Sequence, residues 1–205
     1  MPRFPRILVT TVLSLVAGFD VQAATQQGSN AVVEEFFWYG CPHCGRLEPK
    51  LDTMLAARGG TVRVVRVPVA RTMISRAHQR MYFALKQLGA EQRVHVAIRE
   101  AITSGNTLLL TESAQATFLS ARGVDPAAYR AAYESADVSH ACEVADSEAS
   151  AHGITAIPAL VIRAQVVDPA TVVSQARAKG KDLTGEDEVL GAMVSNVSAQ
   201  LSDVQ

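Results

Sequence analysis

The sequence has few cysteines, almost no net charge and no long apolar run beyond its N-terminus, and each shortage excludes a class of protein. Only three of its 205 residues are cysteines, an odd number and too few for a fold held together by disulfides. The formal net charge is −1 and no block of Lys and Arg stands out, so the sequence predicts no nucleic-acid binding. No later stretch is long and apolar enough to span a bilayer. Hydrophobic residues make up 48% of the chain, which suits one or two globular domains.

The N-terminal residues differ from the rest of the chain. Arg3 and Arg6 precede an apolar run over residues 7–19, and small residues follow. A basic start, an apolar middle and a small-x-small end are typical of a secretory signal peptide, and the run is short for a transmembrane helix. We therefore expect residues 1–23 to be a signal peptide cleaved after Ala23, with an uncleaved anchor as the alternative. In an oxidising compartment disulfides persist, so three cysteines point to chemistry more than to a structural framework.

The rest of the chain alternates strand and helix patterns around a long helical stretch. From residue types and periodicity we expect strands at 31–39, 61–69, 159–162 and 166–167. We expect helices from the 41–44 segment to about 57 and at 81–88, 94–102, 111–119, 125–133, 139–152, 168–180 and 184–201. Thr111, Asp125 and Thr184 are expected to cap three of these helices. The order indicates an α/β fold made of residues 24–69 and 138–205, with an all-helical domain, residues 70–137, inserted between them.

The segment Cys41-Pro42-His43-Cys44 lies where the first strand ends and a helix begins. A helix N-terminus has free N–H groups and a partial positive charge, so the pKa of a thiol there is expected to be lowered. Pro42 fits the first turn because its missing N–H would have no partner. Cys41 and Cys44 share one helix face and can form a disulfide, with Cys44 the more buried of the two. We expect Cys41 to react with substrates and Cys44 to be its redox partner.

His43 lies between the two cysteines, and its ring or N–H can stabilise the Cys41 thiolate if either points at the sulfur. Such stabilisation of the reduced form would make the protein an oxidant. The alternative is an exposed histidine without a role. Zinc sites also use the C-x-x-C spacing, but they need a second pair of ligands. Only His140 is spaced to pair with the remaining cysteine, Cys142, so we expect neither a metal nor another cofactor beyond the Cys41–Cys44 disulfide.

Seven segments in the same order resemble the DsbA family of periplasmic disulfide oxidases, which belongs to the thioredoxin superfamily. They are EFFWYGCPHC, LEP, RVPV, the helical block over residues 76–135, GVD at 123–125, HGITAIP at 152–158 and VVDPA at 166–170. The resemblance covers essentially all of the chain after residue 23, and it implies a thioredoxin fold with an inserted helical domain. The sequence departs from the family in a short lead before the first strand and in Arg163-Ala164-Gln165, which replaces an Asn-Gly turn.

The resemblance implies roles for further residues. Glu35 matches a buried acid that accepts or relays the proton of Cys44, and strand alternation favours Glu35 over Glu34 as the inward residue. Pro158 matches a cis-proline facing the active-site disulfide, with the backbone of Ile157 presented to an extended substrate.

The resemblance also implies an activity and a location. The expected protein is a monomeric periplasmic dithiol oxidase that acts on unfolded exported proteins with free cysteines and is reoxidised by a DsbB-type membrane quinone reductase. Two alternatives use the same cysteines: an isomerase or reductase that is kept reduced, and a thioredoxin-like module that binds copper or zinc. The short N-terminal lead counts against an isomerase, which commonly dimerises through an added N-terminal domain. Cys142 lies outside the family pattern and is expected to be a buried helical cysteine.

Overall fold

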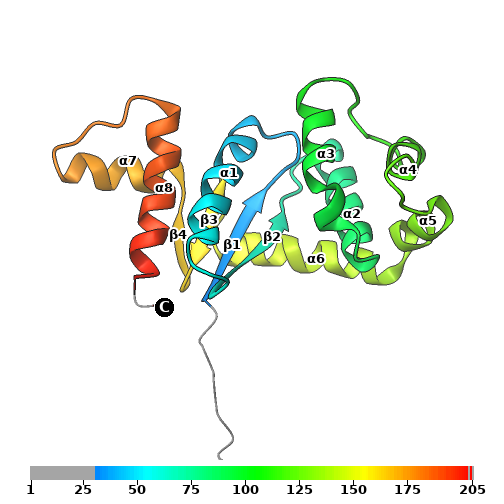
Figure 1. The fold of residues 1–205 in the computed structure, drawn as a ribbon, viewed down its shortest axis with the longest axis horizontal. Coiled ribbons are helices and arrows are strands. Elements are labelled where there is room, and N and C mark those ends of the chain that lie inside the picture. Colours follow the sequence, from blue (N-terminus) through cyan, green and yellow to red (C-terminus); the bar gives the residue numbers. More distant parts are fainter. Residues whose placement is uncertain (1–30, 203, 205) are drawn as a thin grey trace, which may run out of the picture.

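A computed structural model describes residues 31–202 and 204 of the chain (Figure 1). The expected signal peptide therefore lies outside the described residues. The elements in chain order are β1 (Ala31–Phe37), α1 (Pro42–Ala56), β2 (Val62–Pro68), α2 (Met73–Gln87), α3 (Glu91–Thr103), α4 (Glu112–Ser120), α5 (Pro126–Glu134), α6 (Ala136–Ala151), β3 (Ala159–Ile162), β4 (Gln165–Val167), α7 (Pro169–Ala178) and α8 (Glu186–Gln200).

The four strands form one mixed sheet in the order β2-β1-β3-β4. β1 is parallel to β2 and antiparallel to β3, and β4 returns antiparallel to β3 through a two-residue turn. The turn residues Arg163 and Ala164 have φ values of 51° and 61°, a left-handed conformation that the Asn-Gly turn of the family would adopt more easily. Because β1 runs antiparallel to β3, the end of β1 that leads into α1 lies beside the loop that enters β3.

Helices cover both faces of the sheet, and side-chain alternation along β1 decides which residue faces which layer. Val33 packs with α1, α7 and α8 on one face, where Leu47 and Leu190 are also buried. Phe36 packs on the opposite face against α6, near Ala145. Each buried Leu or Val contributes about 1.5–3 kcal/mol by leaving water, so these two layers fix the position of α1 on the sheet.

A third core cluster fills the helical block of α2 to α5, which lies at one end of the molecule (Figure 1). Phe37, Cys41 and Cys44 belong to this cluster, so the cysteines lie where the sheet layer meets the helical block. The long helix α6 joins the two parts: Val138 and Cys142 pack in the helical cluster and Ala149 packs against the sheet. The domain boundary expected at 137/138 thus falls within α6.

The structure confirms two of the three expected helix caps and moves several helix starts. The helix expected at 81–88 begins eight residues earlier, at Met73, because Thr72 caps it, and the helix expected at 94–102 begins at Glu91. The Thr111 side chain accepts a hydrogen bond from the N–H of Ala114, and that of Asp125 accepts one from the N–H of Ala128. The expected cap of α8 was wrong: Gly185 is the N-cap, and the Glu188 carboxylate accepts from the N–H groups of residues 184 and 185. The helix expected at 139–152 begins earlier, at Ala136, because Ser135 caps it.

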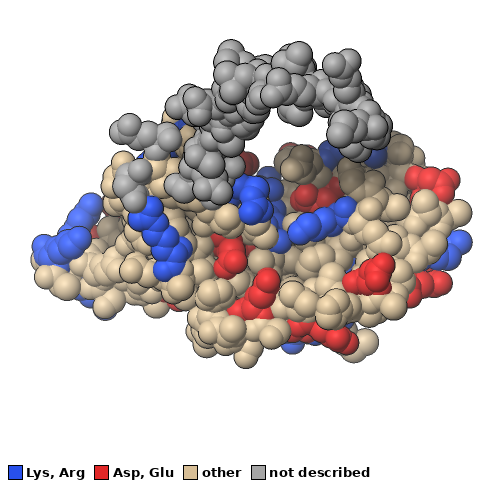
Figure 2. Space-filling view, turned by 90° about the horizontal axis from the view of Figure 1, so that it is seen from below, with Lys and Arg blue, Asp and Glu red and all other residues tan. Residues whose placement is uncertain are grey.

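The described surface carries charges of both signs. Figure 2 shows Lys and Arg side chains interspersed with Asp and Glu on one face, without a continuous basic patch. Within residues 31–202 the structure contains no helix that is long and apolar enough to cross a membrane.

Candidate active site

Cys41 is the N-cap residue of α1, and its sulfur takes the place that an Asp or Ser oxygen fills in other helices. Its backbone is extended, with φ −88° and ψ 111°, and Pro42 follows as the first helical residue. The sulfur accepts a hydrogen bond from the backbone N–H of Cys44 at 3.2 Å. The loop before it is closed by a hydrogen bond from the Cys41 N–H to the Trp38 carbonyl at 2.9 Å. A thiolate at this position therefore meets free N–H donors and the positive end of the helix dipole.

The pKa values of the two thiols are shifted in opposite directions. The pKa of Cys41 is lowered from 9.0 to about 7, chiefly because the Cys44 thiol donates a hydrogen bond to it, with burial acting in the opposite direction. Burial, followed by the neighbouring Cys41, raises the pKa of Cys44 far above its usual range. Cys44 is fully buried, whereas Cys41 keeps 6% of its surface exposed. The order of burial expected from the sequence is confirmed.

The His43 ring lies toward solvent and contacts α8, not the Cys41 sulfur. Its side chain is 57% exposed, and Nδ1 lies 2.5 Å from a carboxylate oxygen of Glu186 at the start of α8. The influence of His43 on Cys41 comes from its charge and from its backbone N–H, both of which lower the Cys41 pKa. Of the two routes expected from the sequence, the route through the ring is not the one that the structure shows, since the ring contacts Glu186.

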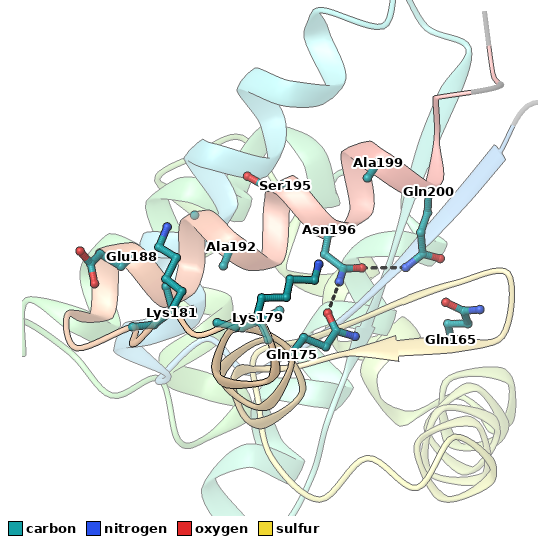
Figure 3. A pocket seen from close by; sticks show the side chains of 14 residues that line it. Gln165, Gln175, Lys179, Lys181, Glu188, Ala192, Ser195, Asn196, Ala199 and Gln200 are labelled. Atoms are coloured by element: carbon teal, nitrogen blue, oxygen red, sulfur yellow. Dashed lines mark hydrogen bonds between the residues drawn. The ribbon is translucent and has the colours of Figure 1, made fainter.

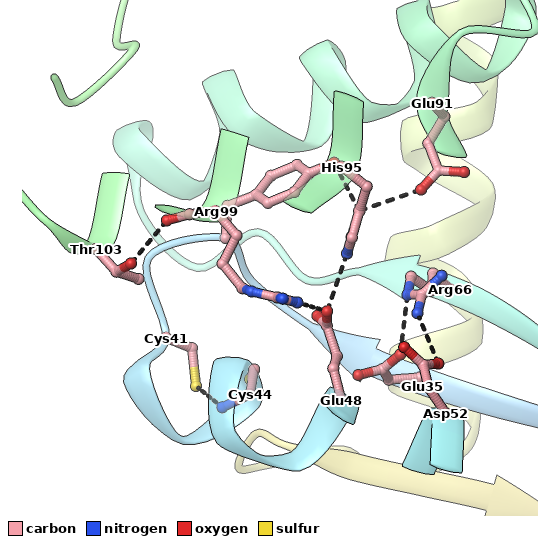
Figure 4. Close-up of polar contacts among 11 residues, drawn as sticks. Glu35, Cys41, Cys44, Glu48, Asp52, Arg66, Glu91, His95, Arg99 and Thr103 are labelled. Carbon is pink, nitrogen blue, oxygen red and sulfur yellow. Dashed lines mark hydrogen bonds and ion pairs between the residues drawn. The ribbon is translucent and has the colours of Figure 1, made fainter. Parts of the chain in front are cut away.

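Glu35 lies fully buried on the face of β1 that α1 covers, which confirms the inward orientation favoured by strand alternation. Burial raises its pKa, and the nearby Arg66, with Nε 3.1 Å from Oε2, opposes that rise. Arg66 also reaches Asp52 at 3.5 Å (Figure 4). Glu34 points the other way and lies 3.3 Å from His152. The acid expected from the family pattern is therefore present, paired with an arginine that the sequence did not reveal.

A second buried acid, which the sequence analysis missed, lies one helical turn beyond Cys44. Glu48 is 2% exposed and contacts the guanidinium of Arg99 and, at 3.2 Å, Nε2 of His95 (Figure 4). Nδ1 of His95 lies 3.0 Å from the Tyr39 hydroxyl. The i, i+4 spacing from Cys44 to Glu48 was the available signal, but its partners come from α3, about 50 residues away in sequence. This cluster joins α1 to the helical block directly behind the cysteines.

The loop between β1 and α1 is held from the helical block as well. Trp38 Nε1 donates to Nδ1 of His78 at 2.9 Å, and the other nitrogen of His78 lies 2.8 Å from the Leu108 carbonyl. Since Nδ1 accepts, Nε2 carries the proton and donates to that carbonyl. Burial lowers the pKa of His78, which keeps the ring neutral in this role. Gly40 leaves room for the Trp38 ring, since a Cβ there would lie 2.4 Å from a ring carbon.

The loop that enters β3 contains the expected cis peptide bond between Ile157 and Pro158. Pro158 is buried, and Ile157 packs against the cluster that contains both cysteines. Ala159, the next residue, pairs with Phe36 of β1. The sheet thus brings the cis-proline loop and the Cys41–Cys44 motif to the same end of the molecule.

A groove of about 810 Å³ lies elsewhere, between α7, α8 and β4 (Figure 3). Polar side chains such as Gln175 and Asn196, which hydrogen-bond to each other at 2.7 Å, form part of its wall. It contains none of the residues expected to act in catalysis.

A strand, a C-x-x-C helix and a cis-proline loop meeting at one end of a four-stranded sheet define the class of thioredoxin-fold thiol:disulfide oxidoreductases. The comparisons agree: a thioredoxin family model matches residues 26–178. The chain is 33% identical to the thiol:disulfide interchange protein DsbA of Burkholderia cepacia over 142 residues, 69% of this chain and 67% of the relative. It is 35% identical to DsbA of Pseudomonas aeruginosa PAO1 over 138 residues, 67% of this chain and 65% of the relative.

The solved structures point to the same family. A crystal structure of a variant of Pseudomonas aeruginosa DsbA superposes with a TM-score of 0.70 at 29% identity, over 87% of this chain and 90% of that one. Unaltered Pseudomonas aeruginosa DsbA gives a TM-score of 0.67 at the same identity, over 87% of this chain and 88% of that one. The chain belongs to the DsbA family of thiol:disulfide oxidoreductases.

Proposed function

We propose that this protein donates a Cys41–Cys44 disulfide to cysteine pairs of exported proteins in the periplasm. The observation that carries the proposal is the position of the two thiols: the Cys41 sulfur caps the N-terminus of α1 and accepts the Cys44 N–H, whereas Cys44 is fully buried. The two pKa values shift in opposite directions accordingly. A stable Cys41 thiolate stabilises the reduced form, so the disulfide is transferred readily to other proteins. Family membership supports the same direction of transfer, and the site needs no cofactor beyond the disulfide itself.

The reaction takes two exchange steps. A substrate thiolate attacks the Cys41 sulfur, the Cys41–Cys44 bond breaks, and Cys44 leaves and takes up a proton because its pKa is raised. A second substrate thiolate then attacks the substrate sulfur of the mixed disulfide and expels Cys41 as a thiolate. Two electrons pass from the substrate dithiol to the protein, and the substrate gains a disulfide. We assign Glu35 the transfer of the Cys44 proton, since it is buried beneath α1 and its negative charge acts on Cys44.

Substrate binding is assigned to the loop at Ile157 and Pro158. An extended peptide beside this loop can pair with the Ile157 backbone while its cysteine meets Cys41, as in strand addition to a sheet edge. Reoxidation requires an acceptor for two electrons, and the family points to a DsbB-type membrane quinone reductase. We propose that the protein works as a monomer after removal of residues 1–23.

The proposal is tested with the mature protein in glutathione buffers of known ratio. The oxidase function predicts that the wild type stays reduced until the buffer is strongly oxidising, and that the reduced form resists urea better than the oxidised form at neutral pH. The oxidised protein should also form a disulfide in a reduced two-cysteine peptide, and the variants C41S and C44S should not. An oxidised form that is more stable than the reduced form favours a reductase, and copper or zinc bound stoichiometrically to the purified protein favours a metal-binding module.

A further inference from the structure

Glu186, the first residue of α8, contacts the His43 side chain, which lies between the two active-site cysteines in sequence. The family model matches residues 26–178 and does not extend to α8, so Glu186 is outside the pattern that defines the site. We propose that Glu186 is a positioning residue that holds the His43 ring away from Cys41 and thereby limits the oxidising strength of the disulfide. This inference rests on the proposed function and concerns how strongly the site oxidises.

The contact fixes which nitrogen of His43 carries a proton. Glu186 Oε1 lies 2.5 Å from His43 Nδ1, and a carboxylate can only accept a hydrogen bond. The pKa of Glu186 is lowered, first by this contact, so the carboxylate is ionised. Nδ1 therefore carries a proton, and this N–H donates a hydrogen bond to Glu186. Arg46 Nη2 approaches the same nitrogen at 3.3 Å, but an unprotonated Nδ1 would set two lone pairs against each other at the shorter distance.

Arg46 forms an ion pair with the Glu186 carboxylate and so limits its electrostatic effect on the His43 ring. Its Nε donates to Oε1 of Glu186 at 2.6 Å and its Nη2 to Oε2 at 2.5 Å, a two-pronged ion pair. Because Arg46 already balances the charge of Glu186, the carboxylate acts on His43 mainly by setting the direction of its Nδ1–H. That hydrogen is then unavailable to the Cys41 sulfur, two residues away on the same helix turn.

The other charged side chains near the N-termini of α1 and α8 pair with other partners. Lys50 of α1 pairs with Asp187 of α8 at 3.2 Å, one turn further along α1. From α3, the Arg99 side chain lies against Gly45, so that a Cβ at that glycine would be 3.3 Å from Arg99 Cδ. The guanidinium of Arg99, however, contacts the buried Glu48. Glu186 is placed independently of His43, since an acid in the first turn of α8 is favoured by the helix dipole. The position of α8 thus determines where the His43 ring points.

The experiment compares the glutathione equilibrium, protein disulfide + 2 GSH ⇌ protein dithiol + GSSG, for the mature wild type and its variants, with the Cys41 pKa measured from thiolate absorbance. In E186A the freed Nδ1–H reaches Cys41, so we expect the equilibrium to move about three- to tenfold toward the dithiol, or about 15–30 mV. The Cys41 pKa should fall by about 0.5–1 unit at the same time. E186Q keeps an oxygen that accepts the Nδ1–H and should shift both quantities less than E186A.

Two controls separate a directed contact from a general charge effect. D187A removes the same charge from the same helix turn and should stay within about twofold of the wild type. In an H43S background, E186A should change neither quantity. The inference is overturned if E186A raises the Cys41 pKa, if D187A matches E186A, or if the effect of E186A persists without His43. The wild-type equilibrium by itself tests the proposed function, so a weakly oxidising wild type would refute that proposal while the variant comparison still decides the role of Glu186.

Discussion

The lowered pKa of Cys41 predicts how the stability of the reduced protein depends on pH. The thiol has a pKa of about 7 in the folded protein and 9.0 as the reference for the unfolded chain. A group whose pKa is lower in the folded state stabilises that state fully above the unfolded pKa, and the contribution is lost as the pH falls through the folded pKa. The relevant window is therefore about pH 5 to 9, with the reduced form gaining stability as the pH rises.

The perturbation is C41S, which keeps the N-cap geometry but does not ionise in this range. From the two pKa values, the Cys41 thiolate contributes essentially nothing at pH 5, ~0.4 kcal/mol at pH 7, ~1.4 kcal/mol at pH 8 and ~2.3 kcal/mol at pH 9. Urea unfolding of reduced wild type and reduced C41S at each pH measures the free energy of unfolding. The difference between the two proteins should grow by about 2 kcal/mol across the window, because contributions from other groups cancel.

Cys142 supplies a matched control. It is buried like Cys41, but burial raises its pKa. Its contribution to the stability of the folded protein is therefore lost, not gained, as the pH rises. The difference between wild type and C142S should stay flat up to about pH 8 and then turn in the opposite direction. If the C41S difference changes by less than about 0.5 kcal/mol between pH 5 and 9, the Cys41 thiolate is not stabilised by the fold, and the argument for an oxidising disulfide loses its basis.

Three further predictions concern the surroundings of the motif. Cys44→Ala removes the thiol donor that contributes most to the lowered pKa of the nucleophilic thiol, so that pKa should rise toward 9.0, as thiolate absorbance would show; an unchanged value would place the cause in the helix terminus. Arg99→Ala leaves the Glu48 carboxylate buried without its main cation and should lower the free energy of unfolding, measured in urea, by about 3 kcal/mol. A loss below about 1 kcal/mol would mean that the ion pair contributes little. Gly40→Ala forces a Cβ onto the ring of Trp38 and should lower the free energy of unfolding by about 1–3 kcal/mol. Because Trp38 is the chain's only tryptophan, its fluorescence should shift too. An unchanged spectrum with full stability would contradict the close packing.

Local patterns in the sequence were enough to predict the strand that leads to the motif and the helix that carries it. β-branched and aromatic residues favour β1, and Pro42 fits the first turn of a helix, so the place of the motif at the junction of strand and helix follows from neighbouring residues alone. Alternation along β1 required one of Glu34 and Glu35 to face inward, and the family resemblance favoured Glu35. The seven segments that resemble the DsbA family likewise lie in the sequence, and the comparisons confirm the family.

Tertiary structure alone decided what surrounds the two thiols. His43 and Glu186 are 143 residues apart, and no periodicity within α1 or α8 predicts that the two helix N-termini meet. The same holds for Glu48, whose partners on α3 belong to the inserted helical block. Helix and strand patterns report which face of an element is apolar, because burial of that face is a property of the element itself. Contacts between polar side chains depend on how two elements pack, which the sequence of either one does not contain.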